Sequence, residues 1–305
     1  MSVYINAASR IITQGITGRA GRLYTERCLR YAAGRECFVA GVHPAKTGQE
    51  IFGLPIYASV REAAAATGAT VSVIYVPPAA AAAAIMEAVE ADVELVICLT
   101  HGVPVRDMLQ VRSRMRAREA AGARATLLLG PDSPGIISPG ALNIGGLPDS
   151  IHRPGRIGVV SRSGTLACEA VLQLREHGLG QSSVVGLGGD IIGGLDFVDV
   201  MRAFNDDEGT DAVVMIGEIG GRGEIDAALW CREHMDKPVI AFIAGAAAPV
   251  GRRLGHGGAF IARPTDSAAA KKQALQECGV HVACDPWDIG ALAARVVRRQ
   301  GAACV

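Results

Sequence analysis

The chain has 305 residues, of which 50% are hydrophobic and only 4% aromatic, and it contains 38 glycines. This length accommodates two domains, and a small-residue composition with many tight turns is typical of layered α/β proteins. Thirty basic residues balance thirty acidic ones, which argues against binding of nucleic acid or an anionic membrane through a general positive field.

The eight cysteines form no Cys-x-x-Cys pair and no close cluster with histidine. Neither a zinc site nor a disulfide framework is indicated, and we expect no bound metal. The N-terminal segment MSVYINAASR lacks the apolar core of a signal peptide, and no run of 18 uncharged apolar residues follows. We therefore expect a soluble cytoplasmic protein with reduced thiols.

The first half of the chain alternates short apolar runs with helical segments. An apolar run ends at Gly15, and a glycine-rich turn and a helix to Tyr31 follow. The other strands expected here are residues 37–42, 71–76, 95–100 and 127–129, with an Ala-rich helix after Pro78 and a helix at 105–118. This alternation predicts a parallel sheet covered by helices on both faces.

A stretch from Gly130 to about Pro154 is rich in Pro, Gly and Ser, with little periodicity, and we place the domain junction there. The alternation then restarts. The expected strands are 157–160, 212–216, 239–244 and 280–283, and the expected helices are 166–177, 224–234 and 267–278. The sequence predicts two doubly wound α/β domains in tandem, residues 1–134 and 135–305.

The first glycine-rich turn, GITGRAG, stands between a strand and a helix, where free N–H groups can receive a phosphate. In an NAD site a carboxylate should end the second strand, but the sequence there has Lys46. A lysine suits the ribose phosphate of NADP or coenzyme A, and an ordinary solvated lysine fits the pattern equally well. A phosphate-binding P-loop is excluded because Ala45 replaces the glycine before this lysine.

The second domain opens with the segment SRSGT directly after a strand. Its small hydroxyl residues fit an ordinary helix cap, and the same helix start also suits an anion. A third strand end carries Glu218, and Gly255–Gly258 surround His256 with glycines. A carboxylate can orient an imidazole and make its other nitrogen more nucleophilic, although a glycine-flanked histidine also fits a tight turn.

Five segments in order carry a family resemblance: QGITG, LPIYASVREAAAATGATVSVIYVP, PGRIGVVSRSGTLACEA, AVVMIGEIGG and GHGGA. Almost end to end, the chain closely resembles the α subunit of succinyl-CoA synthetase and related NDP-forming carboxylate–CoA ligases. The resemblance implies a Rossmann-like CoA-binding domain followed by a flavodoxin-like ligase domain.

The resemblance also implies roles for individual residues. His256 matches the histidine that is phosphorylated, and Glu218 matches the glutamate paired with it. The helix start that receives the phosphohistidine is matched by Ser161, Ser163, Gly164 and Thr165. The CoA site is matched by Thr17, Gly18, Arg19 and Ala20 in the phosphate turn, Lys46 near the nucleotide phosphates, Tyr75, Val76 and Pro77 along the adenine, and Thr100 and His101.

A phosphoryl relay follows from this resemblance. Phosphate passes from ATP or GTP to His256, then to the carboxylic acid as an acyl phosphate, which the CoA thiolate displaces. An ATP-grasp β subunit, which this chain does not contain, supplies the site for the nucleotide with Mg²⁺ and much of the carboxylate pocket.

The chain departs from the family pattern at several positions. Asp132 and Ser133 replace an Asn-Cys pair, His101 replaces a glutamate, and Ile191 replaces a proline. The longer Arg- and Ala-rich segment 112–125 is similar to that of malate–CoA ligases. The acid is therefore open among succinate, malate, another dicarboxylate and a sulfonated acid.

Two other classes of function remain as alternatives. An NADP-dependent reductase would explain the first turn and Lys46 but not GHGGA or SRSGT. A CoA-binding protein without ligase activity would leave the second half without a role.

Overall fold

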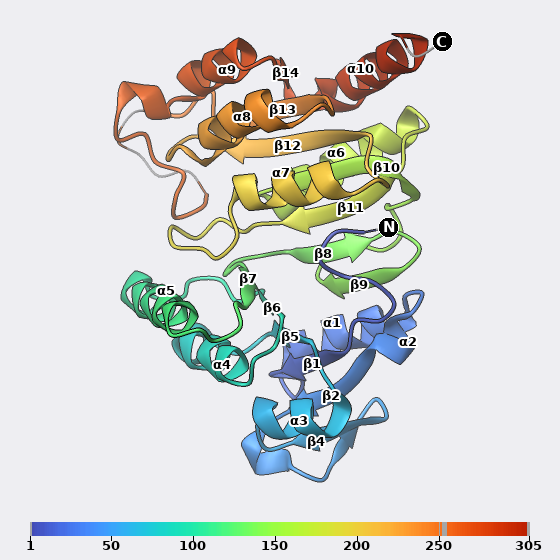
Figure 1. Ribbon diagram of the computed structural model, residues 1–305, viewed down its shortest axis with the longest axis vertical. Coiled ribbons are helices and arrows are strands. Elements are labelled where there is room, and N and C mark those ends of the chain that lie inside the picture. The colour runs from blue at the N-terminus through green and yellow to red at the C-terminus, as the bar shows by residue number, and fades with distance from the viewer. Residues whose placement is uncertain (1, 250, 252–254, 304–305) are drawn as a thin grey trace. The chain divides into compact units, whose positions relative to one another are not determined.

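The computed structural model describes residues 2–249, 251 and 255–303 (Figure 1). These residues form two compact units. The N-unit comprises Tyr4–Leu147 together with Asp190–Leu195, and the C-unit comprises Met1–Val3, Pro148–Gly189 and Asp196–Val305.

The N-unit contains a seven-stranded sheet with the order β3-β4-β2-β1-β5-β6-β7. Its strands are β1 Ile11–Gln14, β2 Phe38–Val42, β3 Glu50–Ile51, β4 Leu54–Tyr57, β5 Val71–Ile74, β6 Leu95–Cys98 and β7 Leu127–Leu129. Neighbouring strands are parallel except for the β3–β4 pair. Every residue of β1, β5 and β6 is buried, as expected for parallel strands covered on both faces.

Helices flank this sheet, and two of them begin at residues that suit a helix start. They are α1 Arg19–Arg30, α2 Gly34–Cys37, α3 Val60–Thr67, α4 Pro78–Glu90 and α5 Val105–Ala120, with a 3₁₀ turn, η1, at Pro44–Lys46. Ser59 caps α3 by accepting the N–H of Glu62, and left-handed Gly68 ends that helix. Pro78 occupies the first position of α4, where a missing N–H costs nothing.

The N-unit extends beyond the border expected at residues 134 and 135. An antiparallel hairpin of β8 (Gly135–Ser138) and β9 (Leu142–Gly145) belongs to it, and the N–H of Ala33 donates to the carbonyl of Ala141. The segment Asp190–Leu195 also belongs here, because its last two N–H groups donate to the carbonyls of Gly130 and Leu128. Backbone hydrogen bonds thus link both segments to the N-unit, and no single cut separates the compact units.

The C-unit contains five parallel strands in the order β14-β13-β12-β10-β11. They are β10 Pro154–Ser161, β11 Gln181–Gly186, β12 Ala212–Glu218, β13 Val239–Ala244 and β14 His281–Val282. The helices are α6 Gly164–Glu176, α7 Phe197–Asp206, α8 Gly223–His234, α9 Ala268–Glu277 and α10 Ile289–Ala303, with 3₁₀ turns η2 Pro264–Asp266 and η3 Pro286–Asp288.

The helices of the C-unit lie on both faces of its sheet. α6 packs against α10, while α7 packs against α8 on the opposite face (Figure 1). Together with the sheet of the N-unit, this arrangement confirms the prediction of two α/β domains, Rossmann-like and then flavodoxin-like.

Among the described residues, no helix is both long and apolar enough to cross a membrane.

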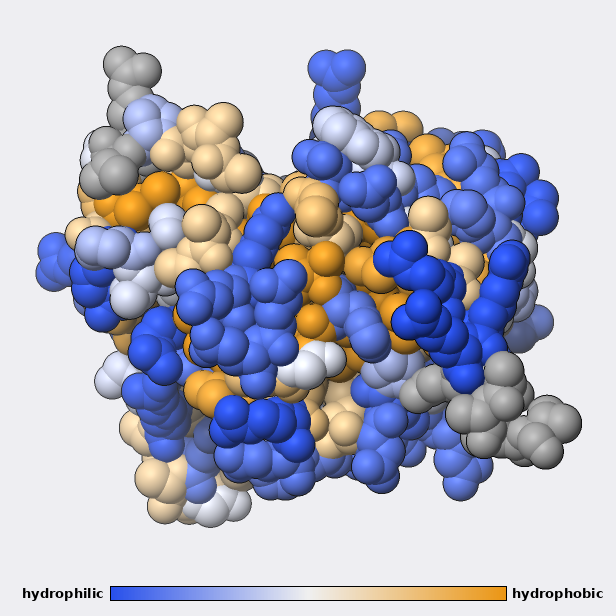
Figure 2. Space-filling view, turned by 90° about the horizontal axis from the view of Figure 1, so that it is seen from above, coloured by the Kyte–Doolittle hydropathy of each residue, from blue (hydrophilic) through white to orange (hydrophobic). Residues whose placement is uncertain are grey.

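Figure 2 views the face over α9 and α10, where hydrophilic residues alternate with smaller hydrophobic areas.

Candidate functional site

Loops of the C-unit converge at the carboxyl ends of β10 and β12, which are neighbours in the sheet. The loop after β10 carries Arg162, whose N–H donates to the carbonyl of Ile216. Its guanidinium lies 4.0 Å from the carboxylate of Glu218, the last residue of β12. In open α/β sheets this edge is where ligands bind.

The imidazole of His256 lies beside Glu218 in this loop cluster. Its Nδ1 is 2.8 Å from Oε2 of Glu218. With Glu218 as a carboxylate, this contact requires a proton on Nδ1, so the lone pair of Nε2 is the nucleophilic one. The other carboxylate oxygen, Oε1, is buried and has no hydrogen-bond partner among the described residues.

Glycines allow His256 to approach the main chain closely. A Cβ added to Gly189 would lie 2.1 Å from Cγ of the imidazole. A Cβ added to Gly220 would lie 2.3 Å from the carbonyl oxygen of Gly258. The loop that carries His256 therefore packs against the main chain at Gly189 and Gly220, where no larger residue fits.

The SRSGT segment forms the N-terminus of α6. The hydroxyl of Ser163 accepts the N–H of Leu166 as the helix cap. The hydroxyl of Ser161 donates to the carbonyl of Ser163 and accepts its N–H. These two hydroxyls thus build the turn, and the first-turn N–H groups of Gly164 and Thr165 are the groups that suit an anion.

The N-unit contains a cavity of about 610 Å³ beside the first glycine turn. Its lining residues come from the ends of β1, β2 and β5 and from α4: Gln14, Gly15, Thr17, Gly18, Val42, His43, Pro44, Tyr75, Val76, Pro77, Ala80, Ala83, Ala84 and Glu87. A Cβ added to Gly15 would lie 3.0 Å from the main chain of Tyr75. The turn and the end of β5 therefore meet closely at the floor of this cavity.

Tyr75 contributes both an aromatic surface and a polar group to this region. Its ring stacks on that of Tyr24, with centroids 5.8 Å apart. Its hydroxyl is buried without a hydrogen-bond partner among the described residues, and burial raises the pKa of Tyr75 well above its usual value. The hydroxyl therefore stays protonated at physiological pH.

Five of the ten residues expected at the CoA site line this cavity: Thr17, Gly18, Tyr75, Val76 and Pro77. The other five do not. Arg19 and Ala20 begin α1, and Lys46 ends η1, two residues after the lining residue Pro44. The hydroxyl of Thr100 donates to the carbonyl of Val76, so it joins the ends of β6 and β5.

His101 lies beside two carboxylates of the N-unit. Its Nδ1 is 3.0 Å from Oδ1 of Asp132 and 4.0 Å from Oδ1 of Asp190. Two of the positions at which the chain departs from the family pattern, His101 and Asp132, are thus in contact with each other. Ligand atoms of the three residues lie within 4.8 Å of one another, and their chemistry suits a divalent cation.

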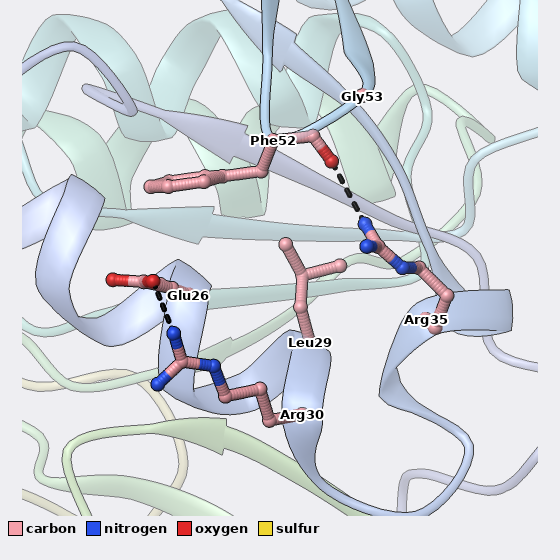
Figure 3. Close-up of a pocket in the computed structure, with 6 residues that line it drawn as sticks. All are labelled: Glu26, Leu29, Arg30, Arg35, Phe52 and Gly53. Carbon is pink, nitrogen blue, oxygen red and sulfur yellow. Dashed lines mark hydrogen bonds and ion pairs between the residues drawn. The ribbon is translucent and has the colours of Figure 1, made fainter.

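A second cavity of the N-unit, about 620 Å³, lies between α1 and the β3–β4 turn. Figure 3 shows that its two arginine side chains point to acceptors within the protein. Arg30 pairs with Glu26, and Arg35 donates to the carbonyl of Phe52 at 2.8 Å. Since these interactions already use its polar groups, the cavity is a weaker candidate than the one beside Gly15.

Sequence reasoning did not single out several residues that the structure brings to His256 and Glu218. Arg162 lies inside the SRSGT motif, and its place in this motif could have identified it as a site residue. Gly189 contacts the imidazole from a distant part of the chain. Glu224 and Lys271 bond to the main chain of Glu218, and nothing in their local sequence marks them.

Comparisons with known proteins agree with this organisation. Residues 6–102 match the family model for a CoA binding domain, and residues 160–281 match that for a CoA-ligase. The α subunits of the ADP-forming succinate–CoA ligases of Staphylococcus epidermidis and Staphylococcus aureus are each 46% identical to the chain over 301 residues. The matches cover 99% of this chain and 97% of each relative.

Solved structures show a related architecture. ATP citrate lyase from Methanothrix soehngenii, in complex with citrate and coenzyme A, superposes with a TM-score of 0.83 at 25% identity. The match covers 96% of this chain and 50% of the lyase chain, so the chain spans about half the length of that protein. A dinucleotide-forming acetyl-coenzyme A synthetase from Ca. Korarchaeum cryptofilum shares the fold, with a TM-score of 0.71 over 93% of this chain and 59% of the synthetase chain at 24% identity.

Proposed function

The chain belongs to the family of succinate–CoA ligase α subunits, and on this premise we propose that His256 is its phosphoryl carrier. The reaction converts a nucleoside triphosphate, a carboxylic acid and CoA to acyl-CoA, a nucleoside diphosphate and phosphate. The 2.8 Å contact between Nδ1 of His256 and Glu218 carries the proposal. It leaves Nε2 as the nucleophile and supplies a negative charge that stabilises the protonated ring.

The relay consists of three displacements. Nε2 of His256 attacks the γ-phosphorus of ATP or GTP, and the nucleoside diphosphate leaves. A carboxylate oxygen of the acid then takes the phosphoryl group, which restores the neutral imidazole and gives an acyl phosphate. The CoA thiolate attacks the acyl carbon, and inorganic phosphate leaves with the electron pair of the broken bond.

The N-terminus of α6 holds the phosphoryl group in this proposal. The N–H groups of Gly164 and Thr165 and the partial positive charge of the helix end stabilise the phosphoryl oxygens. Ser161 and Ser163 act through the turn that they build, because their hydroxyls are bonded within it.

CoA binds to the N-unit in this proposal. The cavity beside Gly15 has the size and the apolar walls of a ligand site, and the buried Tyr75 hydroxyl is a donor without an acceptor among the described residues. Thr17, Gly18, Arg19 and Ala20 present the start of α1 to the phosphates, and Tyr75, Val76 and Pro77 lie along the adenine. Lys46 neutralises a phosphate, and Thr100 and His101 extend the site along the ends of β5 and β6.

The nucleotide with its Mg²⁺ binds to a β subunit of the ATP-grasp class, which completes the enzyme. The ligase acts in the cytoplasm, where reduced thiols persist; no disulfide joins the described cysteines. Succinate is the acid of the α-subunit relatives, and it is the first substrate to test here. Malate, another dicarboxylate and a sulfonated acid are the alternatives, because Asp132 and His101 alter the charge near the end of β6.

An assay of the complete enzyme tests this proposal. The complex is captured from its own cell extract through this chain and supplied with CoA, ATP or GTP, and each of the candidate acids in turn. We expect one acid to give acyl-CoA at a rate that His256→Asn abolishes. CoA binding without acyl-CoA formation from any acid, or NADPH-dependent reduction, would contradict it.

A further inference from the structure

A buried ion pair lies behind the His256–Glu218 contact. Lys271 on α9 is fully buried, and Glu224 in the first turn of α8 is 1% exposed. The ammonium Nζ lies 2.5 Å from Oε2 of Glu224. A buried charge is costly unless it is paired and fully hydrogen-bonded, so the partners of this pair decide what it does.

Lys271 and Glu224 bond to each other and to the main chain at and just after the end of β12. Lys271 donates to the carbonyls of Glu218 and Gly220, at 2.7 and 2.6 Å, as well as to Glu224. These three bonds use its three donors. Oε1 of Glu224 accepts the N–H of Glu218 at 3.0 Å. Two helices thus hold both main-chain polar groups of Glu218.

Gly217, the residue before Glu218, leaves room for the side chain of Glu224. A Cβ added to Gly217 would lie 2.3 Å from Cγ of Glu224 and 2.4 Å from its Oε1. Gly217 is therefore required where the Glu224 side chain crosses the end of β12.

The bonds from Lys271 and Glu224 hold the main chain of Glu218, and its side chain is the part that faces His256. The β12–β13 ladder ends opposite Ala244, whose carbonyl accepts the N–H of Ile219. Oε2 of Glu218 then reaches Nδ1 of His256. A rotation of the Glu218 main chain would move this carboxylate, and errors of about 1 Å in a reacting group are costly.

We propose that Lys271 and Glu224 are positioning residues that fix Glu218, and through it the tautomer and orientation of His256. This inference rests on the proposed phosphoryl transfer. A buried pair is weak evidence for stability, because apolar replacements of similar volume often fold as well. Its use here is to give Glu218 one orientation.

The test replaces the whole pair, so that neither charge is left buried alone. The double variant Lys271→Met/Glu224→Leu is compared with wild type and with Lys272→Met in the assembled α–β complex. Lys272 is the next residue of α9, is only partly buried, and donates to the carbonyl of Cys284, so the control makes the same chemical change away from Glu218. Circular dichroism and thermal unfolding establish that each variant is folded.

Two readouts separate positioning from general structural support. The first is the rate at which γ-labelled ATP or GTP phosphorylates His256. We expect the double variant to lose between about tenfold and about a hundredfold in this rate, with an unchanged KM for the nucleotide. The second is the His256 tautomer, read from ring-nitrogen chemical shifts in ¹⁵N-histidine-labelled enzyme, with His256→Asn identifying the signals. We expect a mixture of tautomers in the double variant and one tautomer in wild type and Lys272→Met.

The outcomes distinguish this inference from the function on which it rests. If wild type is never phosphorylated, the proposed function fails. If wild type is phosphorylated and the folded double variant matches it in rate and tautomer, the positioning role fails. If the double variant does not fold, Glu224→Gln supplies the comparison, because it keeps the size of the side chain and removes the charge. A wild-type rate and tautomer in Glu224→Gln would overturn the inference, and a slower rate with mixed tautomers would support it.

Discussion

Gly189 and His256 are separated by 67 positions in the chain, yet the imidazole packs on the Gly189 backbone so closely that a Cβ there would lie 2.1 Å from Cγ. The N–H of Gly258 also approaches the carbonyl of Gly189, at 3.4 Å. The absence of one side chain thus determines where the ring lies. Since the ring is also held by Glu218, its position is fixed from two directions.

Substitution of Gly189 by alanine is expected to displace the imidazole. We expect phosphorylation of His256 to slow by about tenfold or more, because the ring loses its alignment with the incoming phosphorus. Phosphorylation by γ-labelled nucleotide in the α–β complex measures the effect. Gly223→Ala is the control, since a Cβ there would meet nothing closer than 3.4 Å. Equal rates in the two variants would show that the contact with Gly189 does not position the ring.

Substitution of Glu218 by glutamine tests the charge in the contact. Glutamine keeps the length of the side chain but cannot stabilise a protonated imidazole electrostatically. We expect the phosphorylation rate to fall by about a hundredfold, with CoA binding unchanged because that cavity belongs to the N-unit. Labelling stopped at a series of short times measures the phosphorylation rate, and calorimetric titration of the same preparation measures CoA binding. A rate within about twofold of wild type would mean that the negative charge of the glutamate is not needed.

Filling the cavity beside Gly15 is expected to weaken CoA binding and to leave phosphorylation of His256 unchanged. Ala83→Leu keeps a strong helix former in α4 but places a larger side chain in the cavity. We expect the Kd for CoA to rise about tenfold or more, while His256 is phosphorylated at the wild-type rate. Ala79→Leu, on the same helix outside the lining, is the control. If both variants bind CoA as wild type does, CoA binds elsewhere.

Cys98 is expected to be inert to thiol reagents in the folded enzyme. It is buried at the end of β6, and burial raises its pKa to about 12. At pH 8 only roughly one molecule in ten thousand carries the reactive thiolate. Mass spectrometry after brief iodoacetamide treatment should find Cys98 unmodified, and the exposed Cys284 should serve as the reactive reference. Rapid alkylation of Cys98 would contradict its burial.

The stability of the C-unit is expected to fall in acid because of His152. Its Nδ1 contacts the carbonyl of Pro148 at 2.6 Å, and its buried Nε2 has no partner among the described residues. Burial lowers the pKa of His152 below 6.5. As the pH falls through about 6.5, the unfolded chain takes up the proton first, so the free energy of unfolding decreases.

Thermal unfolding of the complex at pH 5.5 and 7.5 checks this linkage. The decrease in Tm between these pH values should be smaller for His152→Gln, which has no group that titrates in this range. His177→Gln, which changes an exposed histidine, should behave as wild type. An undiminished acid effect in His152→Gln would assign the loss of stability to other groups.

The alternation of apolar runs and helical segments was enough to predict the fold class, and some bounds agree residue for residue. β7 and β13 coincide with the expected strands at 127–129 and 239–244. Hydrophobic runs of buried parallel strands give this strong signal. The β8–β9 hairpin was missed because its four-residue strands lie in a Gly- and Pro-rich stretch with little periodicity. α7 was also missed, although Asp196 and Asp199 form a capping box at its start.

Part of the candidate site could also be predicted. Glu218 was expected at a strand end beside His256, and the structure places the two side chains in contact. The resemblance to a family indicated both residues; spacing alone could not have paired them. Lys271 was beyond sequence reasoning, since KK within AAAKKQAL reads as two solvent-facing residues of a helix. Tertiary packing buries the first lysine fully and the second only in part.

Every step of the proposed relay depends on phosphorylation of His256, and direct labelling tests it. The complex of this chain with its β subunit is exposed to γ-labelled ATP or GTP, and acid-labile, base-stable label is measured on wild type and on His256→Asn. We expect label on wild type that maps to His256, is absent from the variant, and is discharged by CoA together with one carboxylic acid. An absence of label on wild type, with the partner present and nucleotide bound, would contradict it.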